Sequence, residues 1–263
     1  MNASAVPVLE TIGLSKRFGA VTAAWDIHVT LRAGEVVGVI GANGAGKTTF
    51  INMVTGYLKP SAGRVLLRGL EVTGLPPRRM TRLGVMRSFQ IPQLFPDLTA
   101  RENLVVAASL ATGRIPWTFS PLATPARVAA ADQRLADYGL GAYADEKAAV
   151  LPQGVRKLLD IAMATTGQPA LLLLDEPTSG VASDEKHPLM ATVMAAVDRS
   201  QVATLFVEHD MEIIARYATR VMAFYSGEVI SDGPPQGVLA DPRVQQYVVG
   251  RATSRRGEAR ADG

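Results

Sequence analysis

A glycine-rich stretch near the start of the chain most constrains how it can fold. The stretch reads Gly41-Ala42-Asn43-Gly44-Ala45-Gly46-Lys47-Thr48, with the apolar run Val36–Ile40 before it and the helix-compatible segment Thr49–Val54 after it. This spacing of glycines, lysine and threonine is that of a phosphate-binding loop joining a strand to a helix. Its backbone N–H groups can surround a phosphate, and the positive end of the helix dipole adds to the attraction. The sequence therefore predicts a nucleotide site in an α/β fold.

The side chains after the last glycine of the loop have separate expected roles. Lys47 is expected to reach the β- and γ-phosphates, and the Thr48 hydroxyl is expected to bind Mg²⁺. A glycine-rich turn with one solvated lysine is the alternative, and the flanking strand and helix favour the nucleotide site. The loop residues predicted to contact ATP are Gly41, Asn43, Gly44, Ala45, Gly46, Lys47, Thr48 and Thr49.

Composition narrows the class of protein further. Hydrophobic residues make up 48% of the 263, enough to bury a substantial core in one or two domains. The absence of cysteine excludes disulfides and thiolate metal sites. The N-terminus lacks a basic head followed by an apolar run, and no apolar stretch of about eighteen residues occurs, so we expect neither a secretory signal nor a membrane span. A cytoplasmic location is predicted, and the tail Arg251–Gly263 is expected to be frayed.

The order of the predicted elements indicates an α/β fold with a parallel sheet. Two early strands, Val8–Ile12 and Ile27–Leu31, are expected to form an antiparallel flank. Ile91–Pro152 is expected to be helical, apart from an aromatic loop carrying Trp117 that either meets a partner or packs on its own helices. The other predicted strands are Val36–Ile40, Arg64–Arg68, Val85–Gln90, Pro169–Leu174, Val202–Val207 and the hairpin Val221–Tyr225 with Glu228–Ile230. The predicted helices are Pro76–Leu83, Thr99–Leu110, Pro125–Tyr138, Val155–Thr166 and Asp184–Arg199. The spacing of Thr99 and Glu102 predicts a capping box at the start of the second of these helices.

Two acidic residues follow a buried strand, where open α/β sheets bind ligands. Asp175 can hold Mg²⁺ through water opposite Thr48, and Glu176 can polarise the attacking water. A helix start or a surface turn is the alternative for such a pair, and the four leucines before it favour the catalytic interpretation. His209 ends another predicted strand, from which it can hydrogen-bond the γ-phosphate and orient the water.

An aromatic residue, Phe18, lies in a predicted loop upstream of the phosphate site. It can stack on a purine base, or it can belong to the core. Its position alone leaves both interpretations open.

Taken together, these motifs resemble the ATP-binding cassette family, the ATPase subunits of ABC transporters. The resemblance runs from about Leu9 to Gly250. The glycine loop is similar to Walker A and Leu171–Asp175 to Walker B. The resemblance implies that Glu176 is the catalytic glutamate, His209 the switch histidine, Gln90 the Q-loop glutamine and Mg²⁺ ligand, and Phe18 the residue that stacks on adenine.

The family likeness also implies an architecture. We expect an ABC cassette over residues 8–250, with a RecA-like, mostly parallel sheet, antiparallel flanking strands and an inserted helical subdomain. The core subdomain is predicted at 8–90 and 168–250, the helical subdomain at 91–167 and a flexible tail at 251–263. Two cassettes are expected to pack head to tail, with each ATP held between them.

Two motifs depart from the family pattern. The signature L-S-G-G-Q is replaced by Leu151-Pro152-Gln153-Gly154-Val155, which lacks the serine hydroxyl and keeps the Gly154 N–H to face the partner's γ-phosphate. The D-loop S-A-L-D is replaced by Ser179-Gly180-Val181-Ala182, which lacks the carboxylate. These changes are expected to affect turnover and dimer communication more than ATP binding.

Within the family, four features are similar to importers of branched-chain and hydrophobic amino acids. They are the segments Arg87–Gln90, Glu208–Met211 and Pro242–Gly250 and the pattern formed by Phe95, Leu98, Thr99, Glu102, Asn103 and Leu104. The resemblance implies an ATPase at the cytoplasmic face of the cell membrane. Its partners would be transmembrane permeases, a second ATPase subunit, identical or different, and indirectly an extracytoplasmic solute-binding protein, with no nucleic acid. The alternatives are a urea or amide importer, a lipid or lipopolysaccharide exporter, and a soluble ABC ATPase that acts on nucleic acid.

Overall fold

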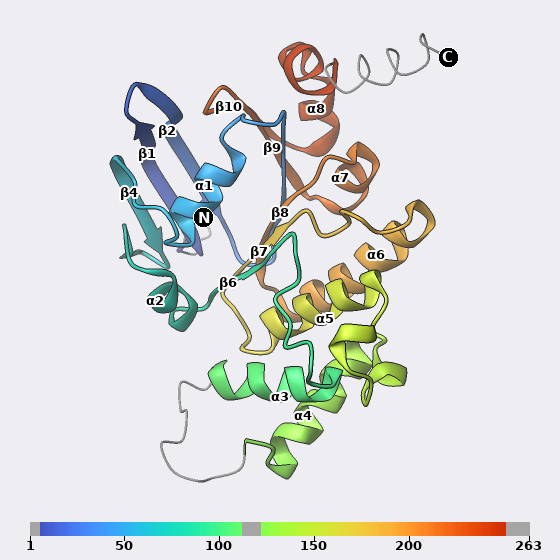
Figure 1. Cartoon of the computed structure of the whole chain (residues 1–263). Helices are drawn as coiled ribbons and strands as arrows, with labels where there is room; N and C mark the ends of the chain where they lie inside the picture. The colour runs from blue at the N-terminus through green and yellow to red at the C-terminus, as the bar shows by residue number, and fades with distance from the viewer. Residues whose placement is uncertain (1–5, 112–121, 251–263) are drawn as a thin grey trace, which may run out of the picture. The chain divides into compact units, whose positions relative to one another are not determined.

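The computed structural model describes residues 6–111 and 122–250 of the chain. These residues divide into two units, one made of 6–80 with 205–250 and the other of 81–204. The junctions fall within helix α2 (Pro77–Arg82) and strand β8 (Ala203–Val207) (Figure 1). The predicted subdomain bounds remain a prediction, and the Trp117 loop and the tail lie outside the described residues.

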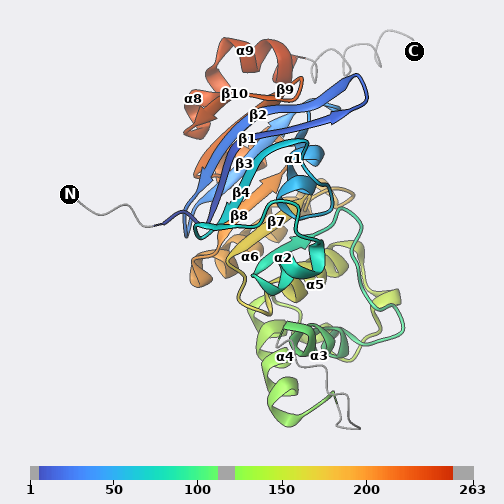
Figure 2. The same cartoon turned by 90° about the vertical axis from the view of Figure 1, so that its left-hand side faces the viewer.

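The first unit contains an antiparallel sheet in the order β2-β1-β4-β5. Figures 1 and 2 show β1, β2 and β4 side by side. The register pairs Leu9 with Leu31 and with Leu67, so apolar residues of three strands meet on one face. This sheet confirms the predicted antiparallel flank, with longer strands than predicted. Its strands are β1 (Leu9–Phe18), β2 (Val21–Leu31), β4 (Ala62–Leu67) and β5 (Leu70–Glu71).

A second set of strands in this unit carries the glycine loop. β3 (Val36–Gly41) pairs in parallel with β9 (Arg220–Tyr225), and β9 pairs antiparallel with β10 (Glu228–Gly233), which confirms the predicted hairpin. Helix α1 (Lys47–Val54) follows β3, and its Phe50 ring lies 5.5 Å from that of Phe224 on β9. The remaining helical elements are α7 (Met211–Tyr217), α8 (Pro235–Ala240), α9 (Pro242–Val244) and a π-helical turn, Gln245–Val249.

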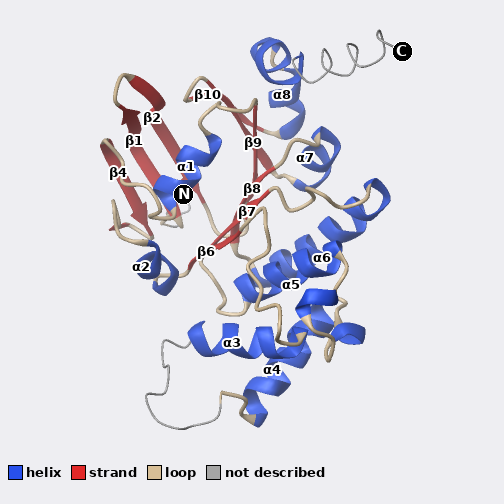
Figure 3. Cartoon of the chain, viewed as in Figure 1, coloured by secondary structure: helices blue, strands red, loops and turns tan. Residues whose placement is uncertain are grey.

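The second unit combines a parallel strand pair with helices (Figure 3). β6 (Val85–Ser88) pairs in parallel with β7 (Leu171–Asp175), whose four leucines are fully buried. Thr99 and Glu102 exchange hydrogen bonds of 3.1 and 2.8 Å, which confirms the predicted capping box. The helices are α3 (Ala100–Ala111), α4 (Pro125–Asp137), α5 (Gln153–Thr165) and α6 (Ser183–Ser200), with 3₁₀ turns at Gly141–Tyr143 and Ala148–Val150.

Two local predictions need correction. β6 ends at Ser88, so Gln90 lies in the following loop and not at the end of a strand. Phe18 is the last residue of β1, because the strand continues beyond its apolar start, and therefore is not in a loop. In the described part of the chain, no helix has the length and apolar character needed to cross a membrane.

Candidate functional site

The glycine loop between β3 and α1 depends on backbone conformations that glycine allows. Gly44 and Gly46 have φ values of 80° and 101°, a region that other residues rarely adopt. A Cβ on Gly46 would lie 2.7 Å from the carbonyl oxygen of Ala23, and one on Gly41 would lie 2.5 Å from that of Phe224. Crowding by neighbouring backbone therefore requires glycine at positions 41 and 46, and backbone conformation favours it at 44.

Neighbouring backbone also fixes the loop. The N–H of Gly227, in the turn between β9 and β10, donates to the Ala45 carbonyl at 3.0 Å, and the Gly227 carbonyl accepts from the Trp25 N–H at 2.9 Å. Inside the loop, the Ala45 N–H donates to the Ala42 carbonyl at 3.1 Å. Strand β2 and a hairpin turn thus hold the phosphate loop through backbone hydrogen bonds.

The start of α1 offers the donors that an anion needs. The helix begins at Lys47, no side chain caps it and no acidic residue occurs in its first turn, so its dipole favours negative charge. The buried ammonium of Lys47 donates to the carbonyls of Gly41 at 2.6 Å and Ala42 at 3.1 Å. Thr48 is exposed and Thr49 half-buried, so both are accessible to a ligand.

Two other predicted residues lie in the first unit. His209 follows β8 and is exposed; the N–H of Glu208 donates to the Val39 carbonyl at 3.4 Å, so this end of β8 lies beside β3. Phe18 is 52% exposed, and the ammonium of Lys16 lies 5.1 Å from the centre of its ring. An exposed ring at the end of a strand is accessible for stacking, although its role remains a prediction.

In the second unit, Asp175 has a partner that the sequence did not reveal. Its Oδ2 lies 2.5 Å from Nη2 of Arg87, and the two side chains are 17% and 9% exposed. Arg87 reaches it because β6 and β7 are parallel neighbours, with Arg87 opposite Leu173. The sequence shows an arginine near the end of the strand before the Q-loop but gives no sign of its partner, 88 positions away.

Glu176 is held at both its backbone and its side chain. Its φ is 49°, a left-handed conformation that is uncommon outside glycine. Gln90 Nε2 donates to its Oε2 at 2.8 Å, and Lys157 Nζ donates to its carbonyl oxygen at 2.9 Å. The structure thus brings together two predicted catalytic residues that lie far apart in the sequence.

The unusual signature and D-loop residues contact each other within this unit. Gly154 lies in the first turn of α5, which has no side-chain cap. Gly180 has φ 73°, and a Cβ on it would lie 2.3 Å from Nε2 of Gln153. The glycine at position 180 therefore leaves room for the glutamine that replaces a glycine of the usual signature.

The proposed Mg²⁺ ligands have suitable chemistry. Thr48 supplies a hydroxyl, Asp175 a carboxylate and Gln90 an amide oxygen, and Mg²⁺ prefers hard oxygen ligands with one or two carboxylates and substrate phosphates. Thr48 belongs to the first unit and the other two to the second. Among residues 6–111 and 122–250, no cluster of three or more acidic, histidine or cysteine side chains forms a metal site.

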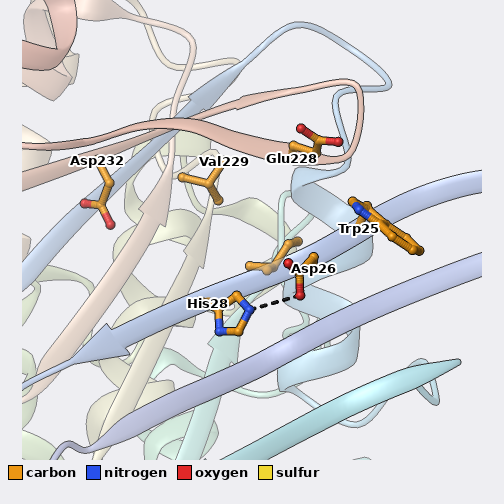
Figure 4. Close-up of a pocket in the computed structure, with 7 residues that line it drawn as sticks. Trp25, Asp26, His28, Glu228, Val229 and Asp232 are labelled. Atoms are coloured by element: carbon orange, nitrogen blue, oxygen red, sulfur yellow. Dashed lines mark hydrogen bonds and ion pairs between the residues drawn. The ribbon is translucent and has the colours of Figure 1, made fainter.

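A cavity of about 440 Å³ lies in the first unit, and none of the residues that line it is a predicted site residue. Figure 4 shows His28 turned toward Asp26, with 3.0 Å between Nε2 and Oδ1. Both side chains are exposed. The cavity is lined by Trp25, Asp26, Ile27, His28, Glu228, Val229 and Asp232.

A glycine-built loop at a helix N-terminus, and acidic residues at the end of a parallel strand, define a nucleotide-binding protein of the phosphate-loop class. The family model described as "ABC transporter" matches residues 25–179. This chain belongs to the ABC transporter family, and its fold confirms the prediction of an ABC ATPase cassette.

Curated relatives match almost the whole chain. The high-affinity branched-chain amino acid transport ATP-binding protein BraF of Pseudomonas aeruginosa is 34% identical over 94% of this chain and 99% of its own. LivG of Escherichia coli, with the same description, is 34% identical with the same coverage. Among solved structures, the ADP conformation of MJ1267, an ATP-binding cassette of an ABC transporter, is 29% identical with a TM-score of 0.82 over 92% of this chain and 98% of its own.

Proposed function

We propose that this chain is the ATPase subunit of an importer for branched-chain or other hydrophobic amino acids. The observation that carries the proposal is the 34% identity to BraF and LivG along 94% of the chain, because it extends well beyond the ATP-binding motifs.

Hydrolysis is assigned to the site residues predicted from the sequence. The loop from Gly41 to Thr49 binds the phosphates of ATP, Lys47 contacts the β- and γ-phosphates, and Phe18 stacks on the base. Glu176 polarises the attacking water, Gln90 orients Glu176, and His209 hydrogen-bonds the γ-phosphate. Thr48, Asp175 and Gln90 would hold Mg²⁺, which when bound would neutralise the negative charge that develops on the phosphates.

The expected assembly follows from the single phosphate loop of the chain. A second cassette, identical or different, presents its signature helix to this ATP, and Gly154 of this chain faces the ATP of the partner. Transmembrane permeases bind the cassette pair at the cytoplasmic face of the cell membrane. A solute-binding protein delivers the amino acid from outside, and nucleic acid has no part.

Co-purification followed by uptake tests this proposal. A tagged copy is recovered from mildly solubilised native membranes, its partners are identified, and the complex is reconstituted in vesicles containing ATP. We expect two permeases and a second cassette, with ATP-dependent uptake of leucine. Uptake of urea in place of leucine would overturn the proposed substrate. Recovery of the chain with ribosomes or DNA and without membrane proteins would overturn the transport role.

A further inference from the structure

Helix α5 carries two charged side chains that are almost fully buried. Lys157 is 4% exposed and Asp160 is 7% exposed, and they are three positions apart, on one face of the helix. Charged groups are seldom buried to this extent unless they are paired or serve a function. Their partners therefore indicate what this face of α5 does.

The partners of Asp160 lie on either side of Gln90, at the two ends of the Q-loop segment Ser88–Gln93. Its Oδ2 accepts a hydrogen bond of 2.6 Å from the Ser88 hydroxyl, and its Oδ1 accepts one of 2.9 Å from the Gln93 N–H. Ser88 is the last residue of β6, and Gln93 comes shortly after Gln90. One carboxylate thus joins the beginning and the end of the segment that carries Gln90.

Lys157, one turn earlier on α5, holds Glu176, the residue that the Gln90 amide contacts. Its ammonium donates to the backbone carbonyl of Glu176, while the Gln90 amide donates to the carboxylate of Glu176. A left-handed residue such as Glu176 keeps its conformation only where its surroundings fix it. A single helix face therefore fixes both the glutamate and the loop that contacts it.

We propose that Asp160 is a positioning residue for ATP hydrolysis, which holds the Ser88–Gln93 segment so that the Gln90 amide reaches the carboxylate of Glu176. The inference rests on the proposed function, because it takes Gln90 and Glu176 as groups of the hydrolytic site. The hydrogen bonds of Asp160 go to Ser88 and Gln93 and not to either of these two side chains.

The chemistry of the contact explains why an aspartate occupies this position. Both partners donate, and an ionised carboxylate only accepts, so its two oxygens match the hydroxyl and the N–H. An amide at position 160 keeps the volume but offers only one oxygen, so its NH2 group can face only the Ser88 hydroxyl, which would then have to accept instead of donate. Both contacts also become weaker, neutral hydrogen bonds. Asp160→Asn should therefore loosen the Q-loop without leaving a cavity.

The energetics also favour a role other than stabilisation. Burial raises the pKa of Asp160 above its ordinary value, against the opposing effects of hydrogen bonds from Ser88, Gln93 and Phe89 and of the positive charge of Lys157. Folding therefore disfavours the ionised form compared with the unfolded chain. The ionised carboxylate therefore contributes less to stability than its hydrogen bonds alone would, which fits a positioning role.

A double-mutant cycle on the full chain tests the proposal. ATP affinity and steady-state hydrolysis are measured for the wild type, Asp160→Asn, Gln90→Ala and the double variant. We expect Asp160→Asn to lower kcat about 10-fold, because small displacements of reacting groups have large kinetic effects. Asp160→Asn should change the Kd for ATP by less than about twofold. When Asp160→Asn is added to Gln90→Ala, the further loss in kcat should be below about twofold, because both substitutions act through one contact.

Thr165→Val is the matched control. Thr165 is buried on the same helix, and its hydroxyl lies 2.9 Å from that of Tyr138 instead of bonding the Q-loop. It should lower the melting temperature and leave kcat unchanged. Ser88→Ala, which removes one donor to Asp160, should lower kcat in the same direction as Asp160→Asn and serves if that variant does not fold.

The proposal would be overturned if Asp160→Asn and Gln90→Ala had independent, multiplicative effects on kcat. It would also be overturned if Asp160→Asn had the kcat of the wild type. If Asp160→Asn does not fold, a wild-type kcat in Ser88→Ala would overturn it. A fully active Glu176→Gln variant would instead contradict the assigned hydrolytic site. Loss of hydrolysis in Glu176→Gln with unchanged kcat in Asp160→Asn would leave the proposed function intact and exclude only the role of Asp160.

Discussion

The phosphate loop and the end of strand β7 are built in different ways. The loop takes its shape from glycines at positive φ and from backbone groups of Ala23, Phe224 and Gly227 that press against it. Around Asp175 and Glu176, the fixing groups are side chains from distant segments: Arg87, Gln90 and Lys157. The difference suggests that nucleotide binding depends on backbone geometry, whereas hydrolysis depends on side-chain contacts.

The strongest challenge to the backbone part of this comparison is Gly46→Ala. The new Cβ would lie 2.7 Å from the Ala23 carbonyl at a φ of 101°, so the loop must move. We expect ATP affinity to fall about 100-fold, corresponding to about 2.7 kcal/mol. Titration with a fluorescent nucleotide measures the loss.

Gly44→Ala is the control for that substitution. Its φ is 80°, and nothing lies within 4 Å of the added Cβ, so only backbone strain opposes it. The expected loss in affinity is about tenfold, since a left-handed residue costs roughly 1–2 kcal/mol. Equal losses at the two positions would show that crowding does not determine the loop geometry.

Arg87→Met tests whether a side-chain partner stabilises the carboxylate of Asp175. Removing the cation leaves Asp175, only 17% exposed, without the charge that compensates it. We expect the free energy of unfolding to fall by about 2 kcal/mol, less than for a fully buried pair. Urea denaturation measures the effect, and Arg87→Met with Asp175→Asn should recover part of it. An Arg87→Met variant as stable as the wild type would argue against the pair.

The smallest expected effect concerns the pH dependence of stability at Asp160. Because burial raises its pKa above 3.8, protonation is more favourable in the folded than in the unfolded chain. The contribution of Asp160 to the free energy of unfolding is fully present below its pKa in the unfolded chain and is lost as pH rises through its raised pKa in the folded chain. The stability of Asp160→Asn relative to the wild type should therefore increase as pH rises from the unfolded-state pKa to the folded-state pKa. Denaturation at a series of pH values measures the trend, and a constant difference would contradict it.

Local sequence patterns were sufficient to predict most of the elements. The capping box at Thr99 marked the start of α3, and the four leucines before Asp175 marked a buried parallel strand. The phosphate loop was predictable because its spacing expresses a backbone geometry. The exact ends of β1 and β6 were not, because a strand can continue wherever its neighbour supplies hydrogen bonds.

The contacts that complete the candidate site were beyond a sequence pattern. The pairs Arg87–Asp175 and Ser88–Asp160 join residues 88 and 72 positions apart, which only the folded chain brings together. Asp160 and Lys157 occupy positions on a helix where charged residues usually face water, and nothing in the local pattern indicated burial. Gln153 and Gly180 were recognised as departures, but their contact required the structure.

The most direct measurement compares Lys47→Ala with Glu176→Gln in the same two assays, ATP binding and ATP hydrolysis. We predict that Lys47→Ala weakens binding itself, whereas Glu176→Gln binds ATP as the wild type does and loses at least about a hundredfold in kcat, as expected when a group that activates water is removed. Wild-type turnover by Glu176→Gln, or equal losses of binding in both variants, would contradict the separation of a backbone-built binding site from a side-chain-built hydrolytic site.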